Sequence, residues 1–312
     1  MKWTKAPLLG VSAAASWAWG TSLIVGMEIA QQKGLAAWFI WAIANAATLA
    51  LFGWLFETER IPAEIYSRPA VKAVGVIIQL FCLVIQLNAI YTILLSFMDS
   101  GAYLLTSALG IIIALLMFKN GLRTSVKTDI AQWAILIVSV LAILGVALAG
   151  GAPRMELAQS ATGDIWWGIW SACILLSAPI GDVQHWQRAR VMEGRAYFVG
   201  SIWFAIYLAL VLAMACFEFS PLMNVILLVA VLCVTTSTMD SIAVALHEAG
   251  GKKIGTCVFV LFCIVWGATI EMGILNIWTK FGVVRVGFAL AILAASYFIR
   301  RRKNANSQKE TS

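Results

Sequence analysis

The sequence predicts an all-α integral membrane protein of about ten transmembrane helices. Hydrophobic residues make up 62% of the chain and charged residues only 12%, a composition that soluble globular proteins do not have. Apolar runs of about 20 residues recur with short polar gaps between them, and each can cross a hydrocarbon core of roughly 30 Å. The first and sixth of these runs are interrupted in the middle.

The predicted spans occupy nearly the whole chain. The gaps between them are too short for a soluble domain, so we expect no enzyme activity in an attached domain and no cofactor apart from an ion. The first run is too long and too interrupted for a cleaved signal peptide. In chain order the spans are 8–30, 35–56, 70–97, 101–118, 129–150, 164–184, 197–217, 222–246, 254–275 and 281–299.

The interruptions lie at Trp19-Gly20-Thr21-Ser22 and at Ser177-Ala178-Pro179-Ile180-Gly181-Asp182. In each, glycine or proline breaks the helical hydrogen-bond ladder beside hydroxyl side chains. Unpaired backbone groups at bilayer depth are tolerated only where protein or a polar cavity satisfies them. Interrupted helices at matching places in two halves are typical of the ion and substrate site of an inverted-repeat carrier. The alternative is an ordinary kink at each place.

The distribution of lysine and arginine predicts the orientation. With the N-terminus in the cytoplasm, eighteen of the 22 basic residues fall inside, and only Lys33, Arg154, Lys280 and Arg285 fall outside. The positive-inside rule therefore places both termini in the cytoplasm of a multi-pass cell-membrane protein. The basic tail, 301–312, follows Arg300 and is expected to contact anionic lipid headgroups of the bilayer rather than nucleic acid.

The eighth span carries an unusual group of polar residues, Thr235-Thr236-Ser237-Thr238-Met239-Asp240-Ser241. Sodium is a hard cation that prefers oxygen ligands, which hydroxyls and backbone carbonyls supply. The interrupted first span offers such carbonyls. The alternative is that these small polar residues only mediate helix packing. His185 and His247 stand at predicted helix ends, where we expect them to be solvated.

Several stretches resemble the solute:sodium symporter family, in the same order and over nearly the full length. Residues 15–22 are similar to its first core helix, and residues 120–132 follow its GGLxAxxxTDxxQ signature. Residues 182–189 resemble its QR element after core helix six, and residues 237–241 its STxDS motif in core helix eight. The tryptophans of span one and the Trp186-Gln187-Arg188 stretch are most similar to the branch that includes urea symporters.

The resemblance implies a LeuT-type fold, with residues 1–150 and 151–300 as two inverted five-helix repeats. It implies a sodium site between core helices one and eight, and it assigns Asp129 to the cytoplasmic ion exit. The sugar-binding residues of the family are absent here, which disfavours a sugar. The implied sodium ligands are the carbonyls of Ala15, Ala18 and Val234 and the hydroxyls of Ser237 and Thr238.

The sequence therefore predicts a sodium-coupled transporter of a small organic solute: urea-like, an amine or a small carboxylate. Trp19, Ser22 and Ser177 are candidate solute contacts, with Trp17 and Trp41 as cavity walls. Asp182 is expected to form a gate ion pair with Arg188. Proton coupling through Asp182 or Asp240, a non-transporting sensor or accessory subunit, and homo-oligomerisation all stay open.

Overall fold

The computed structural model describes residues 6–98, 100–119 and 122–310, and its regular structure is helical throughout. Lys2, Lys5, Asn120, Gly121 and the last two residues of the basic tail lie outside the described residues. In chain order the helices are α1 (Ala6–Trp17), α2 (Gly20–Gln32), α3 (Gly34–Glu57), the 3-10 helix η1 (Ala63–Ser67), α4 (Pro69–Leu94), α5 (Ala102–Lys119), α6 (Leu122–Ala149), α7 (Thr162–Gly181), α8 (Val183–Ala189), α9 (Gly194–Ala215), α10 (Pro221–Gly250), α11 (Lys252–Val265), the 3-10 helix η2 (Trp266–Met272) and α12 (Ile274–Glu310).

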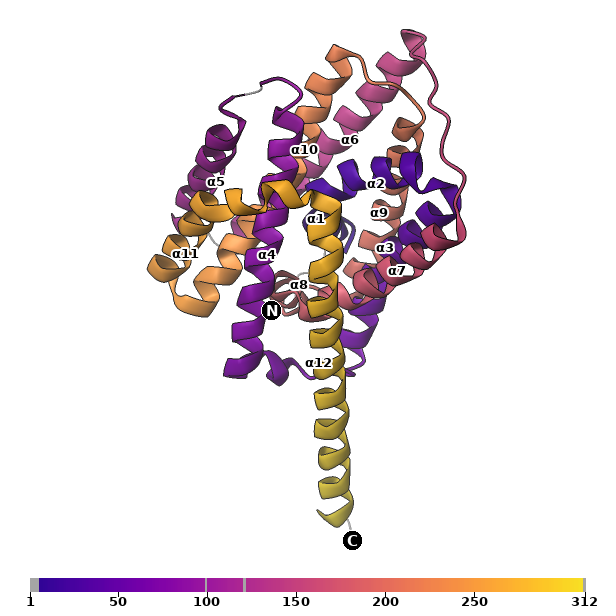
Figure 1. Cartoon of the computed structure of the whole chain (residues 1–312). Helices are drawn as coiled ribbons and strands as arrows, with labels where there is room; N and C mark the ends of the chain where they lie inside the picture. Colours follow the sequence, from indigo (N-terminus) through magenta and orange to yellow (C-terminus); the bar gives the residue numbers. More distant parts are fainter. Residues whose placement is uncertain (1–5, 99, 120–121, 311–312) are drawn as a thin grey trace.

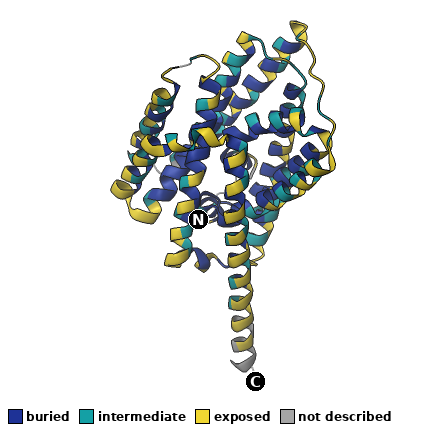
Figure 2. Cartoon of the chain, in the orientation of Figure 1, coloured by how far each residue is buried: buried dark blue, intermediate teal, exposed yellow. Residues whose placement is uncertain are grey.

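Among the described residues, seven helices are long and apolar enough to cross a membrane, and α1 with α2 forms an eighth candidate span. Large hydrophobic side chains such as Leu104, Val138 and Phe298 are exposed on the outer faces of the bundle. Figure 2 shows such exposed positions along α5, α11 and α12, around a buried interior. Apolar surface of this extent indicates contact with lipid. The chain is therefore an all-α, multi-pass membrane protein, as predicted.

The ten predicted spans are all helical in the structure, but not all of them are long and apolar enough to be counted as candidate membrane spans. Helix α5 is apolar but shorter than the others, and α7 is not among the seven long apolar helices. Length and hydropathy thus support up to eight spans, and ten crossings stay a prediction.

The helices enclose α1, α8 and the middle of α10. Helix α3 packs against α7 and α9, α1 packs against α9, and α10 packs against α4 and α6. Helix α12 packs along α7 and then extends well beyond the other helices toward the C-terminus (Figure 1). Because these neighbours surround them, both interrupted segments lie in the interior.

The first predicted break is confirmed. Helix α1 ends at Trp17, α2 begins at Gly20, and the two helix axes differ by 67°. The backbone groups released by the break find partners within the protein. The Gly20 amide donates to Oε1 of Gln86 in α4 at 3.0 Å, and the Ser22 hydroxyl donates to the carbonyl of Trp19 at 2.7 Å.

The second break lies later than predicted. Helix α7 continues through Ser177 and Pro179 to Gly181, and the chain leaves the helical conformation at Asp182 (φ −97°, ψ 110°). The prediction that Pro179 interrupts this helix is wrong, because one proline removes a single hydrogen bond and a helix can continue past it with a kink. Asp182 then caps α8 by accepting a hydrogen bond from the amide of Gln184 at 3.2 Å.

Gly20 is required by close packing at the first break. A β-carbon at this position would lie 2.3 Å from Cγ2 of Thr235 and 2.9 Å from Cβ of Ala89. We expect Gly20→Ala to destabilise the protein by about 1–3 kcal/mol through overpacking, and Gly20→Leu to prevent solute binding as well. The measurement is the thermal unfolding midpoint of the purified protein.

Two further variants check that explanation. Thr235→Ser removes the Cγ2 methyl group, so it should restore much of the stability lost in Gly20→Ala. Gly145 in α6 has no atom within 4 Å of an added β-carbon, so Gly145→Ala should not lower the midpoint. A Gly20→Ala variant as stable as the wild type would show that the break tolerates a side chain.

Candidate functional site

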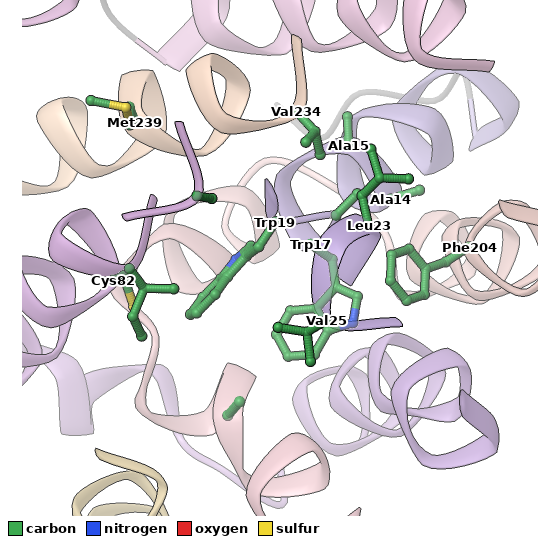
Figure 3. Packing of buried hydrophobic residues seen from close by; sticks show 14 of the residues in the cluster. Ala14, Ala15, Trp17, Trp19, Leu23, Val25, Cys82, Phe204, Val234 and Met239 are labelled. Carbon is green, nitrogen blue, oxygen red and sulfur yellow. The ribbon is translucent and has the colours of Figure 1, made fainter. Parts of the chain in front are cut away.

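A cavity lies beside the first helix break, inside the bundle. The space not occupied by atoms at this place, including the solvent-open part, is about 370 Å³. The rings of Trp17 and Trp19 lie close together on this side of the break, with their centroids 6.3 Å apart (Figure 3). A concave, largely aromatic space with a few polar groups is typical of a small-molecule site. Its lining residues are Trp17, Trp19, Thr21, Ser22, Val25, Trp41, Asn45, Leu175, Trp278 and Arg285.

Most of the predicted solute residues meet at this cavity. Trp19 and Ser22 line it, and so do the two predicted walls, Trp17 and Trp41. Ser177 does not line it, because α7 is still helical there and the Ser177 hydroxyl donates to the carbonyl of Ile174 at 2.9 Å. The two halves of the protein therefore contribute to the cavity unequally.

Sequence reasoning missed other lining residues, above all Asn45, Trp278 and Arg285. Asn45 accepts a hydrogen bond through Oδ1 from the indole nitrogen of Trp17 at 2.8 Å. Arg285 was counted among the outside charges, although it lies within the apolar run 281–299. An arginine inside such a run is itself a signal of function, and this signal could have found it.

Arg285 and Asp182 form a buried ion pair at the edge of the cavity. Nη2 of Arg285 lies 3.7 Å from Oδ2 of Asp182, and the two side chains are 2% and 0% exposed. The Arg285 guanidinium also lies over the Trp19 ring, 4.8 Å from its centroid. Asp182 accepts hydrogen bonds from the side-chain amides of Gln79 at 2.5 Å and of Gln184 at 2.9 Å.

The predicted gate pair between Asp182 and Arg188 is wrong. Arg188 instead donates to Oδ2 of Asp129 in α6 at 2.9 Å. Six positions along a helix of 3.6 residues per turn correspond to about 240° of rotation, so α8 directs Arg188 away from Asp182. Asp182 therefore pairs with a residue of the cavity, Arg285, and Arg188 belongs to a second buried site.

This second site joins two aspartates and one arginine. Arg188 donates to Asp129 and also to the hydroxyl of Ser241 at 2.8 Å, and its side chain is fully buried. Asp240 accepts a hydrogen bond from the hydroxyl of Ser125 at 2.8 Å. With both carboxylates ionised, this cluster carries one uncompensated negative charge. A buried charge of that kind is costly unless a proton or a cation balances it.

The predicted sodium residues lie next to this cluster. Ala15 and Ala18 stand at the end of α1, where the last carbonyls of a helix lack intrahelical partners. Helix α1 packs against α10, and Figure 3 shows Val234 beside Ala15. Ser237 and Thr238 lie on the following turn of α10 and are buried.

The hydroxyls of the predicted sodium site both donate their protons within the protein. Ser237 donates its proton to Oδ1 of Asp129 at 2.7 Å, and Thr238 donates to the carbonyl of Val234 at 3.2 Å. Each hydroxyl oxygen therefore keeps lone pairs for a cation. Asp129 also accepts from Ser12 of α1 at 2.5 Å, so its carboxylate bridges α1 and α10. These residues fit a sodium ion held by neutral oxygens beside one carboxylate.

The two ends of the bundle differ. At one end an open depression, lined by Ile24, Glu28, Lys33, Met272 and Asn276 among others, lies about one turn along α2 from the cavity residues Thr21 and Val25. At this end α2 and α12 contribute to both the depression and the cavity.

At the opposite end, Trp186 and Gln187 of α8 and the adjoining Arg190 line a pocket together with residues of α10. Arg190 pairs with Glu248 of α10 at 2.6 Å, and Gln187 donates to the same carboxylate at 2.5 Å. Trp186 is buried and packs against Tyr66 of η1. These contacts lie between the buried ionic cluster and the surface.

His185 was expected to be solvated and is instead buried, because α8 turns into the bundle. Its ring packs against Trp17 and Phe52, with centroids 5.3 Å and 6.0 Å away. His247 is partly exposed and lies 2.9 Å from the hydroxyl of Thr256.

Comparison with protein-family models and with curated proteins finds no match for this chain. The resemblance to solute:sodium symporters therefore stays a prediction.

The ionic cluster yields a stability prediction. Arg188→Gln should cost roughly 3–5 kcal/mol in sodium-free buffer at pH 8, because it leaves two buried carboxylates without a cation. Adding Asp240→Asn to that variant should restore part of the loss, because it removes one of the two charges. Thermal unfolding midpoints of the purified variants measure both effects.

The control is Glu248→Gln, which breaks the half-exposed pair with Arg190 and should cost no more than about 1 kcal/mol. An Arg188→Gln variant that unfolds at the wild-type temperature would show that the two carboxylates do not depend on this arginine.

Proposed function

We propose that this protein is a sodium-coupled secondary transporter that carries a small organic solute by alternating access. The observation that carries the proposal is the buried cluster of Asp129, Asp240 and Arg188. With both carboxylates ionised, its excess negative charge lies beside the hydroxyl of Ser237 and is bonded to α1, the helix that ends at the first break, through Ser12. The cavity on the other side of the same break is a suitable place for the solute. One interrupted helix would then contact both the ion and the solute.

Helix contacts support an arrangement in two inverted five-helix repeats of LeuT type. If α1/α2 to α6 form the first repeat and α7/α8 to α12 the second, contacts should occur in equivalent pairs. The contact of α1 with α9 has its equivalent in that of α7 with α3, and the contact of α1 with α6 in that of α7 with α12. The contact of α6 with α10 has its equivalent in that of α12 with α4.

The orientation predicted from the basic residues assigns each end of the bundle to one side of the membrane. With both termini in the cytoplasm of the cell membrane, the open depression near Lys33 faces outward and the Arg190–Glu248 contact faces inward. We interpret this conformation as accessible from outside, with the inner end held together by the contacts of α8 with α10. In transport, the α8 contacts to α10 would separate to release ion and solute.

Coupling in this proposal follows from differential affinity. Sodium at Ala15, Ala18, Val234, Ser237 and Thr238 would hold α1 against α10 and so stabilise the shape of the cavity. An ion that prefers the same state as the solute raises solute affinity, and the solute raises ion affinity by the same factor.

Proton coupling is the second candidate. It is favoured by the carboxylate of Asp240 in the buried cluster. A proton on this carboxylate would also remove the excess charge of the cluster. Ion dependence separates the two candidates, because sodium coupling requires a sodium effect at constant pH. A protein with neither a sodium nor a proton effect would agree better with a sensor or accessory subunit.

The sodium site can be tested without knowing the solute. Sodium should raise the unfolding midpoint, because a ligand that binds the native state stabilises it. In Ser237→Ala with Thr238→Ala, the half-maximal sodium concentration should rise about tenfold or more, equivalent to about 1.4 kcal/mol. The titration is made at constant pH and ionic strength, with N-methylglucamine replacing sodium.

Thr236→Ala is the matched control. Its hydroxyl lies on the same helix but accepts from Gln132 of α6 at 2.9 Å, so the sodium titration should not change. Unchanged sodium dependence in the folded Ser237/Thr238 double variant would contradict the sodium assignment.

A further inference from the structure

The cavity contains hydrogen-bond donors that have no partner. Nε and Nη2 of Arg285 and Nε1 of Trp19 are buried, and among the described residues none of the three has a hydrogen-bond acceptor. Both side chains line the cavity, and the guanidinium lies over the Trp19 ring. Buried unpaired donors are costly, and charged ones more so, which indicates a missing acceptor at this place.

Asp182 does not supply that acceptor. Its carboxylate lies 3.7 Å from Nη2 of Arg285, beyond hydrogen-bond distance, and it already accepts from Gln79 and Gln184. Asp182 therefore balances the charge of the arginine while leaving its N–H groups available. The guanidinium remains able to bind a second anion.

Cavity acceptors, by contrast, are already engaged. Oδ1 of Asn45 accepts from the Trp17 indole. The Ser22 hydroxyl donates to the carbonyl of Trp19, so its oxygen is the acceptor for the Tyr207 hydroxyl, 3.2 Å away. A solute rich in donors, such as an amine or urea, would meet a cation and few free acceptors. A solute that brings acceptor oxygens would satisfy the unpaired donors.

We propose that the solute is a small monocarboxylate, bound through its carboxylate by the guanidinium of Arg285 and the indole N–H of Trp19. Guanidinium and carboxylate match as planar two-point partners, which makes arginine the side chain best suited to this group. The apolar part of the solute would pack against Trp17, Trp41 and Trp278. This inference rests on the proposed function, because it names the solute class for the same cavity.

The first experiment measures ligand class on the purified full-length protein in sodium chloride at pH 7.5. Acetate, propionate and pyruvate are compared with acetamide, propionamide and propylammonium by unfolding midpoint and by tryptophan fluorescence. We expect a saturable response to at least one carboxylate and none to its amide or amine counterpart. An equal or stronger response to the amide or the amine would overturn the proposal.

The second experiment tests the residues. Arg285→Gln should weaken carboxylate binding at least ~30-fold, because a buried charged partner is lost. Arg285→Lys should recover only part of the affinity, because it keeps the charge and loses the two-point geometry. If Arg285→Gln unfolds, Arg285→Gln with Asp182→Asn removes both charges and should fold without binding carboxylate. Wild-type affinity in either folded variant would overturn the assignment.

Trp19→Phe removes the indole N–H and keeps an aromatic ring at this position. It should weaken carboxylate binding several-fold, whereas Trp133→Phe, which removes an unpaired buried indole N–H outside the cavity, should not. Arg60→Gln is the matched control for the arginine, because Arg60 lies over Trp54 at the surface, 4.4 Å from its ring centroid. Equal losses in Trp19→Phe and Trp133→Phe would count against the indole contact.

The outcomes also distinguish this inference from the proposed function. Carboxylate binding that depends on Arg285 but not on sodium would retain the inference and contradict sodium coupling. Sodium-dependent uptake of a neutral solute, with no response to carboxylates, would retain the transporter and contradict the inference.

Discussion

Two glutamines of α4 satisfy polar groups at both helix breaks, and the arrangement of the site depends on them. Gln86 accepts from the amide of Gly20, and Gln79 donates to the carboxylate of Asp182. They lie about two turns apart on one face of α4, so a single continuous helix supports both interruptions. Without them, a backbone amide and a carboxylate would lack these partners in a low-dielectric interior, where each loss costs free energy. Because the bond between the Gly20 amide and Gln86 holds the chain at the first break, it also holds the preceding residue, Trp19, in place.

Buried charge then divides the interior into two sites of different character. Arg285 and Asp182 balance each other at the cavity, so this site is neutral overall and offers donors. With both carboxylates ionised, Asp129, Asp240 and Arg188 leave a negative excess, so that site offers acceptors. One site with free hydrogen-bond donors and another with free acceptors are what simultaneous binding of an anion and a cation requires.

Hydropathy and helix-breaking residues were sufficient to predict the helical segments and the first break, because these signals act locally along the chain. The break after Pro179 was placed too early, because a helix held by neighbours can continue past a proline. The partners of Arg188 and the burial of Arg285 could not be predicted, because they depend on how α8 and α12 are rotated against other helices. The glutamines of α4 are polar residues within an apolar run, a signal that sequence analysis could have used.

The short helix α8 connects the two buried sites. Asp182, which balances Arg285 at the cavity, caps the first turn of α8, and Arg188 near its end binds Asp129. Asp129 in turn accepts the proton of Ser237, a predicted sodium ligand. An anion bound by Arg285 would therefore lie near the start of α8, and a cation bound beside Asp129 would lie near its end. Because Gln187 of α8 and the adjoining Arg190 both contact Glu248 of α10, the two ligands would act on the same contact between α8 and α10.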